Sequence, residues 1–133
     1  MKFEQLEKKM KDAKLLSFKE RELVPETSGI YTAWLSVFGQ FRCLYVGKSS
    51  NLSNRVWSHF SGKRGGDQFC LYVYDRYVHD KRPPGLSTQE VDKLTGKYIQ
   101  ERIKFKFVQL PKNKITEAER FFRKTWKPIL NPL

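Results

Sequence analysis

The sequence has few cysteines and histidines and no long apolar run. Two of each are scattered along the 133 residues, which excludes the ligand spacing of a zinc site. No segment approaches the ~18 apolar residues of a membrane helix, and no apolar stretch follows the basic N-terminus as a secretory signal requires. We therefore expect a cytoplasmic protein outside the membrane, with Cys43 and Cys70 as reduced thiols packed in apolar segments.

Acidic residues are also scarce relative to basic ones. The chain has 14 Asp and Glu against 26 Lys and Arg, a formal net charge of +12. These cations are spread over the whole chain, whereas membrane-binding segments concentrate them on one amphipathic helix. The charge therefore favours DNA as the partner, although part of it serves solubility.

The length and composition predict one folded domain behind an N-terminal extension. With 39% hydrophobic residues, the chain can bury a core. Residues 1–24 are expected to be a helical extension, with a charged helix over 2–20, which either packs through its apolar stripe or presents lysines to DNA. Pro25 then begins the main domain, residues 25–133.

The first strands are expected to form a hairpin over residues 29–47, with its turn at Gly39-Gln40. Aromatic and β-branched residues dominate both arms. A strict two-residue turn at that position pairs Trp34 with Tyr45 and puts Tyr31 on the opposite face. If both tyrosines serve one site, the hairpin must contain a longer loop or a bulge.

A helix over residues 51–60 is expected to follow, capped by a side-chain oxygen of Ser49, Ser50 or Asn51. Its apolar stripe consists of Leu52, Val56 and Phe60. Arg55 and His59 lie about 60° round the helix from that stripe. A cation and an imidazole at the rim of a buried face suit a phosphate site, and the simpler alternative is two solvated polar residues.

The remaining elements complete an α/β (α+β) domain with a small, three-stranded, mainly antiparallel central sheet flanked by helices. Residues 67–78 look strand-like, and residues 103–110 alternate as a core strand with Lys104 and Lys106 outward. Two more helices are expected: one capped by Ser87 or Thr88 that ends near Arg102, and one capped by Thr116 that ends before Pro128.

Between about Ser28 and Asn131, several motifs occur in an order by which the chain resembles the GIY-YIG nuclease family. They are Gly29-Ile30-Tyr31, Tyr45-Val46-Gly47, Lys48, Arg55 ten residues after Tyr45, His59, Glu119, Pro128 and Asn131. The block from Tyr45 to Phe60 is especially similar to the nuclease domain of bacterial nucleotide-excision repair. Two features depart from the family: a slightly longer connection between the signatures and a basic insertion at about residues 61–84.

The resemblance implies a metal-dependent DNA endonuclease that uses one Mg²⁺ ion per active site, with Mn²⁺ as a possible substitute. Glu119 is the expected metal ligand, since Mg²⁺ uses one or two carboxylates and keeps several waters. Thr116-Glu117-Ala118-Glu119 is also a capping-box pattern. On that alternative, Glu119 serves only to start its helix.

The other expected catalytic residues act on the water and the phosphate. Tyr31 is the first candidate for the general base and Tyr45 the second. The pKa of the tyrosine hydroxyl that acts as the base is expected to be lowered by Lys48 and Arg55. Arg55 also offers a planar fork for two phosphate oxygens. Two further residues have supporting roles: His59 orients or protonates, and Asn131 supports the site through a hydrogen bond.

The basic insertion supplies the expected DNA contacts. Its candidates for backbone phosphates are Lys63, Arg64, Arg76, Lys81 and Arg82. The alternative for these cations is solubility, and the alternative for the whole chain is a basic nucleic-acid-binding module that does not cleave. The sequence does not specify the target: either the insertion and the N-terminal helix recognise the DNA, or a homodimer or a separate DNA-recognition partner does.

Overall fold

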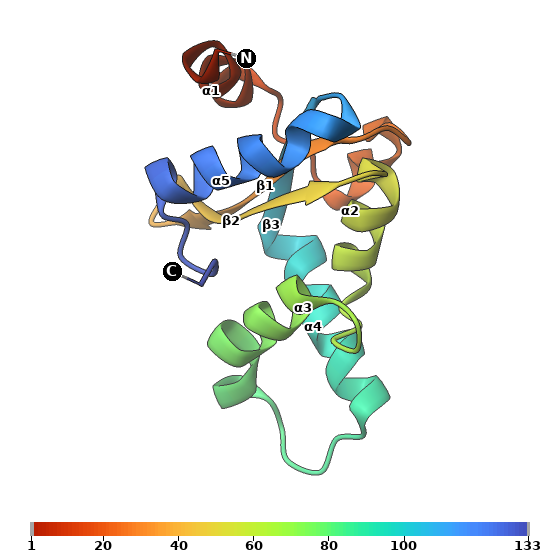
Figure 1. The fold of residues 1–133 in the computed structure, drawn as a ribbon. Helices are drawn as coiled ribbons and strands as arrows, with labels where there is room; N and C mark the ends of the chain where they lie inside the picture. Colours follow the sequence, from red (N-terminus) through yellow and green to blue (C-terminus); the bar gives the residue numbers. More distant parts are fainter. Residues whose placement is uncertain (1, 133) are drawn as a thin grey trace.

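The computed structural model describes residues 2–132, so the outer limits of the expected extension and domain, residues 1 and 133, lie outside the described range. At its centre is an antiparallel sheet of three strands: β1 (Gly29–Val37), β2 (Gln40–Ser49) and β3 (Ile103–Gln109). Their order is β2-β1-β3, which leaves β2 at an edge. Helices flank this sheet (Figure 1), and the predicted fold class is confirmed.

Helices cover both faces of the sheet. One face packs against α1 (Phe3–Asp12) and α5 (Ile115–Trp126) through a core that includes Met10, Ile30 and Phe122. The opposite face packs against α2 (Leu52–Ser61), α3 (Gln68–Val73) and α4 (Thr88–Arg102). Within residues 2–132, no helix has the length and apolar character needed to cross a membrane.

Side-chain caps define where two of these helices begin. Asn51 accepts a hydrogen bond from the Asn54 amide at the start of α2. Ser87 and Glu90 form a reciprocal capping box at the start of α4. The predicted helix over 51–60 and the predicted helix that ends near Arg102 are thus confirmed.

The hairpin contains the bulge that a shared tyrosine site requires. Its turn lies at Phe38 and Gly39, both with positive φ, rather than at Gly39-Gln40. The register shifts between Ala33, which pairs with Tyr45, and the next residue of β1. Tyr31 and Tyr45 therefore point to the same face, with ring centroids 6.3 Å apart.

The prediction of a strand at residues 67–78 is wrong, because this segment is helical. It forms α3 and continues as a π-helical turn, Tyr74–Val78. Asp67 caps α3 by accepting a hydrogen bond from the Cys70 amide, and the buried residues fall at helical spacing. The aromatic and β-branched content favours a strand, but burial of one helical stripe against α4 and the sheet overrides that preference.

The N-terminal segment also differs from the expectation. The predicted helix over 2–20 is interrupted, since α1 ends at Asp12 and a short 3-10 helix follows at Phe18–Leu23. Because α1 covers that face of the sheet, Lys106 is buried instead of facing outward. Its Nζ donates to the Lys11 carbonyl at 2.6 Å.

The last helix does not begin at a threonine cap. Lys114 occupies the N-cap of α5 and makes no side-chain capping hydrogen bond, while Thr116 lies in the first turn and its hydroxyl accepts from Lys48 Nζ at 2.9 Å. The expected Thr116 cap is therefore wrong. The capping-box explanation of Glu119 falls with it.

Gly47 is required by its position opposite Tyr31 across the hairpin. A Cβ at this residue would overlap the Tyr31 hydroxyl and ring, because the tyrosine side chain passes directly over the glycine. The glycine of the second signature is therefore a packing requirement of the first signature's tyrosine.

We expect Gly47→Ala to lower the free energy of unfolding by about 1–3 kcal/mol, the usual cost of overpacking a core. Urea unfolding followed by circular dichroism measures this loss. Gly65→Ala is the control, since no atom lies within 4 Å of a Cβ there, and it should change stability by less than about 0.5 kcal/mol. Equal effects of the two substitutions would contradict the steric account.

Candidate active site

A cavity of about 200 Å³ opens beside the edge strand β2. It gathers six of the seven residues expected to be catalytic, together with three more. Its lining consists of Tyr31, Tyr45, Gly47, Lys48, Arg55, His59, Gln68, Phe69 and Glu119.

These side chains come from both faces of the sheet. The two tyrosines lie on the face that packs against α2 and α3, and α2 supplies Arg55 and His59. Glu119 comes from α5, which packs on the opposite face. The strand β2 lies at an edge of the sheet, with α5 beside it (Figure 1). Glu119 of α5 therefore reaches the same cavity at that edge.

A buried chain of hydrogen bonds leads away from the cavity. The Tyr31 hydroxyl lies 2.7 Å from Nε2 of His59, and Nδ1 of His59 lies 2.8 Å from a carboxylate oxygen of Asp67. All three residues are at most 3% exposed. Asp67 also accepts from the Ser58 hydroxyl at 2.6 Å and from the Cys70 amide at 3.0 Å, so its carboxylate is fixed in place.

The charge states of the residues in this hydrogen-bond chain follow from their contacts. Burial opposes ionisation of Asp67, but the hydrogen bond from His59, with those from Ser58 and Cys70, lowers the pKa of the carboxyl to about 2. Burial lowers the pKa of His59, although Asp67 opposes that shift. The pair is therefore carboxylate and neutral imidazole at neutral pH. Asp67 holds the proton on Nδ1, so Nε2 accepts from the Tyr31 hydroxyl.

The tyrosines are not phenolates in this environment. Burial raises the pKa of Tyr31 well above its ordinary value of 10, and Arg55 lowers it by less. Burial also raises the pKa of Tyr45. The expectation that Lys48 and Arg55 lower the tyrosine pKa is therefore wrong, because desolvation outweighs their field. A proton that leaves Tyr31 must pass to a neighbouring acceptor, and His59 Nε2 is in contact with it.

The open side of the cavity carries the charged groups. Arg55 and Lys48 are exposed, so their side chains meet solvent at the cavity rim. Within residues 2–132, Glu119 is the only carboxylate that lines the cavity, and Arg123 lies 3.9 Å from it. One carboxylate with solvent access fits the requirement of Mg²⁺, which keeps most of its waters.

Asn131 acts on the strand beside the cavity. Its side-chain oxygen accepts from the Val46 amide at 2.7 Å, and its side-chain nitrogen donates to the Val46 carbonyl at 3.0 Å. These two bonds hold the C-terminal segment against β2 between Tyr45 and Gly47. The residue thus fixes the strand from which the second tyrosine projects.

A second group of potential metal ligands is fully buried. Ligand-type atoms of His59, Asp67 and Cys70 lie within 4.8 Å of one another. Both ring nitrogens of His59 are occupied by hydrogen bonds, and the Cys70 thiol lies 3.3 Å from the His59 carbonyl as its donor. Burial raises the pKa of that thiol, whereas a metal ligand must be thiolate. We therefore assign this group to the hydrogen-bond chain.

Sequence reasoning missed Asp67. It lies in the segment that looked like an insertion, and the strand expected there concealed its role. The available signal was an aspartate followed by Phe69, Cys70 and Val73 at helical spacing, which is the pattern of a capped amphipathic helix.

The cations expected to contact DNA lie away from this cavity; none of the five lines it. Arg64 forms an ion pair with Asp92 at 2.7 Å and lies over the Tyr74 ring. Two others also lie over aromatic rings, Arg76 over Tyr77 and Arg82 over Tyr74, while Lys63 and Lys81 are exposed.

Comparisons with known proteins gave a match among solved structures alone. No family model and no curated protein matches the chain. Two crystal structures of the GIY-YIG N-terminal endonuclease domain of UvrC from Thermotoga maritima are similar to it; both are tyrosine-to-phenylalanine mutants bound to the catalytic divalent cation. They share 19% and 18% identity, with TM-scores of 0.47 and 0.45, and each alignment covers 86% of this chain and 93% of the other.

Since both TM-scores lie below 0.5, we base the function on this chain's own residues and their geometry.

The lowered pKa of His59 predicts an acid-sensitive fold. The unfolded chain binds a proton near pH 6.5, whereas folded His59 does not, so acidification favours unfolding. The free energy of unfolding should fall below pH 6.5, by up to about 1.4 kcal/mol per pH unit, until folded His59 protonates. Asp67 should add a further loss below about pH 4.

Urea unfolding between pH 7 and pH 5 tests this, together with nitrogen chemical shifts of the His59 ring. We expect a proton on Nδ1 and none on Nε2 at pH 7. An imidazolium at pH 7, or stability that does not change between pH 7 and pH 5, would contradict the assignment.

Proposed function

We propose that this protein is a metal-dependent DNA endonuclease that hydrolyses phosphodiester bonds with one Mg²⁺, or Mn²⁺ in its place, held by Glu119. One observation carries the proposal: the buried chain from Tyr31 through His59 to Asp67 ends in the same cavity as Glu119 and Arg55. A base, a metal ligand and a phosphate-binding cation are the parts that such a hydrolysis needs.

The exposed side of the cavity binds the substrate phosphate. Arg55 offers a guanidinium that binds two phosphate oxygens and stabilises charge on the phosphate. Lys48 supplies a second cation at the rim, where Thr116 orients its ammonium group. A metal ion held by Glu119 would stabilise the negative charge that develops on the phosphate and the leaving oxygen.

The proton of the attacking water leaves along the buried chain. Tyr31 accepts a proton from the water while its own hydroxyl proton passes to Nε2 of His59. The imidazolium that forms is stabilised by the Asp67 carboxylate at 2.8 Å. This transfer explains how a tyrosine with a raised pKa serves as a base, because the phenolate never accumulates. Tyr45 remains the second candidate for the base; its ring centroid lies 6.3 Å from that of Tyr31.

The alternative is a basic nucleic-acid-binding module that does not cleave. The net charge of +12 serves such a module as well as a nuclease. A buried chain of three polar side chains is costly to maintain for binding alone, which favours the enzyme. Supercoiled plasmid incubated with Mg²⁺, and again with EDTA, separates the two: a nuclease relaxes or linearises the plasmid only with the metal, and a binding module does neither.

We also propose the wider setting of this activity. Residues 1–24 are an extension and residues 25–133 the nuclease domain, with residues 61–84 as a basic insertion. The protein acts in the cytoplasm, as its free cysteines suggest. DNA recognition beyond the cavity involves cations of the insertion, a homodimer or a partner protein.

Glu119→Gln should abolish Mg²⁺-dependent cleavage, because glutamine keeps the shape and loses the charge that binds the metal. Stability should stay within about 1 kcal/mol of wild type, since Glu119 is not a helix cap. Glu117→Gln is the control: it is exposed on the same helix, about 200° away. The metal assignment fails if the Glu119 variant cuts plasmid at the wild-type rate.

Asp67→Asn should reduce the single-turnover cleavage rate at least about 100-fold and leave DNA affinity unchanged. Asparagine can turn its amide to His59 and select the wrong tautomer, the defect that costs about 10⁴ in serine protease triads. Tyr31→Phe should be impaired to a similar extent. Asp92→Asn removes the charge that pairs with Arg64 at a position outside the cavity, and it should retain full activity. Normal cleavage by the Asp67 variant would remove the proton path.

A further inference from the structure

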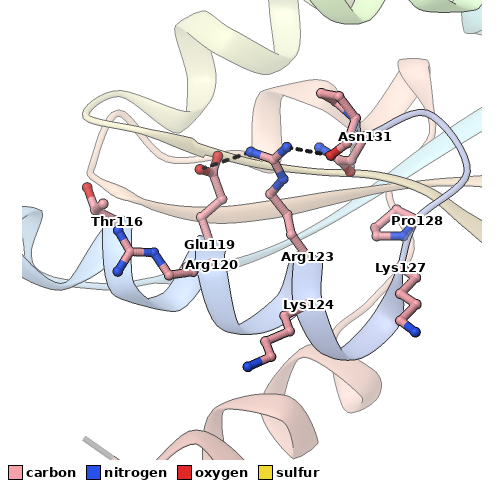
Figure 2. A pocket seen from close by; sticks show the side chains of 9 residues that line it. Thr116, Glu119, Arg120, Arg123, Lys124, Lys127, Pro128 and Asn131 are labelled. Carbon is pink, nitrogen blue, oxygen red and sulfur yellow. Dashed lines mark hydrogen bonds and ion pairs between the residues drawn. The ribbon is translucent and has the colours of Figure 1, made fainter.

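A second and larger cavity, of about 520 Å³, lies against α5 and the C-terminal segment. Figure 2 shows its side chains, most of which are basic or belong to the tail. The lining consists of Thr116, Glu119, Arg120, Arg123, Lys124, Lys127, Pro128, Asn131 and Pro132. We call Arg120, Arg123, Lys124 and Lys127 the α5 basic surface.

The sequence of α5 separates this surface from the core. At about 100° per residue, Arg120, Arg123 and Lys124 fall between about 40° and 140° from Glu119 on one side. The buried residues fall on its other side: Ile115, Ala118 and Phe122. Lys127 follows at the C-cap. Glu119 therefore lies at the border where the buried face of the helix meets its cationic face.

The cations of this surface are largely uncommitted to other groups. Arg123 donates to the Pro132 carbonyl at 2.9 Å and lies 3.9 Å from Glu119. Within the part of the chain that the structure describes, the side chains of Arg120, Lys124 and Lys127 form no hydrogen bond or ion pair. Arg64 of the insertion differs, since its guanidinium is already paired with Asp92.

The surface is continuous with the proposed active site. Glu119 lines both cavities, and Lys48 at the rim of the smaller cavity donates to Thr116 in the larger one. From Thr116 to Lys127 the helix advances roughly 16 Å, at 1.5 Å per residue. That length corresponds to about five nucleotides of one strand at 3.4 Å each. A strand with its reacting phosphate at Arg55 can therefore continue along α5.

We propose that the α5 basic surface binds the backbone phosphates of the DNA strand next to the cleavage site. The location of the reacting phosphate in this proposal rests on the proposed nuclease function. Free cations in a row beside a phosphate site are what a polyanion requires, and such contacts hold the strand without reading its bases. The DNA thus crosses the edge of β2 and runs along α5.

Salt-dependent DNA binding tests the proposal without requiring cleavage. The anisotropy of a fluorescein-labelled 20-base-pair duplex is measured in EDTA between 50 and 250 mM salt. The test variant is Arg120→Gln with Lys124→Gln. The matched control is Lys93→Gln with Lys97→Gln, an exposed i, i+4 cation pair on α4 that lines neither of these two cavities. Thermal unfolding confirms that both variants fold.

The α5 variant should bind at least about tenfold more weakly than wild type at 150 mM salt. The slope of log affinity against log salt should fall by about two, since each lost phosphate contact removes about 0.9. The α4 control should lose less than threefold with its slope unchanged. Equal affinities and slopes for the two variants would overturn the proposal, because the cations would then act only through net charge.

The outcomes also separate this proposal from the nuclease function. If wild-type protein does not cut plasmid with Mg²⁺ but the α5 variant shows the reduced slope, the α5 surface stands and the nuclease function falls. If wild-type protein cuts and the two variants bind alike, the nuclease function stands and the α5 surface falls.

Discussion

The hydrogen bond between the Tyr31 hydroxyl and Nε2 of His59 is the contact on which the site depends. It joins β1 to α2 inside the core, and it imposes conditions on three other parts of the chain. The β1–β2 hairpin must be bulged, Gly47 must lack a side chain, and Asp67 must hold the far side of the imidazole. Both signature motifs therefore serve one buried contact between a strand and a helix.

The second constraint is the position of β2 at the sheet edge. A central strand would separate α5 from the tyrosines, whereas an edge strand lets helices on opposite faces supply one cavity. Asn131 holds this strand through two backbone hydrogen bonds at Val46. The same edge brings the cationic face of α5 beside the cavity, so the proposed hydrolysis and the proposed DNA binding share one border.

Local patterns made most of the fold predictable from the sequence. Periodicity and caps predicted α2 and α4 nearly to the residue, and the order of the motifs identified six residues that line one cavity. The bulge was predictable only as a condition, because two tyrosines of uncertain register do not reveal which residue is inserted. Helical periodicity and caps depend on residues that are close together in the chain, so the sequence carries that information directly.

The errors arose where distant contacts decide the structure. Residues 68–78 have strand-forming side chains, yet packing on α4 and the sheet makes them helical and so hides the role of Asp67. The same holds for Lys106, which α1 buries, and for the start of α5, where Thr116 bonds Lys48 instead of capping. Nor does the net charge reveal which cations remain free on α5.

We propose that the divalent ion binds at Glu119, at the open edge of β2, and not in the buried group of His59, Asp67 and Cys70. A crystal soaked in Mn²⁺ and measured at the manganese edge tests this directly. We predict one anomalous peak about 2.1 Å from the Glu119 carboxylate, with waters as its other ligands. A peak between His59 and Asp67, with none at Glu119, would contradict both the metal assignment and the proton path.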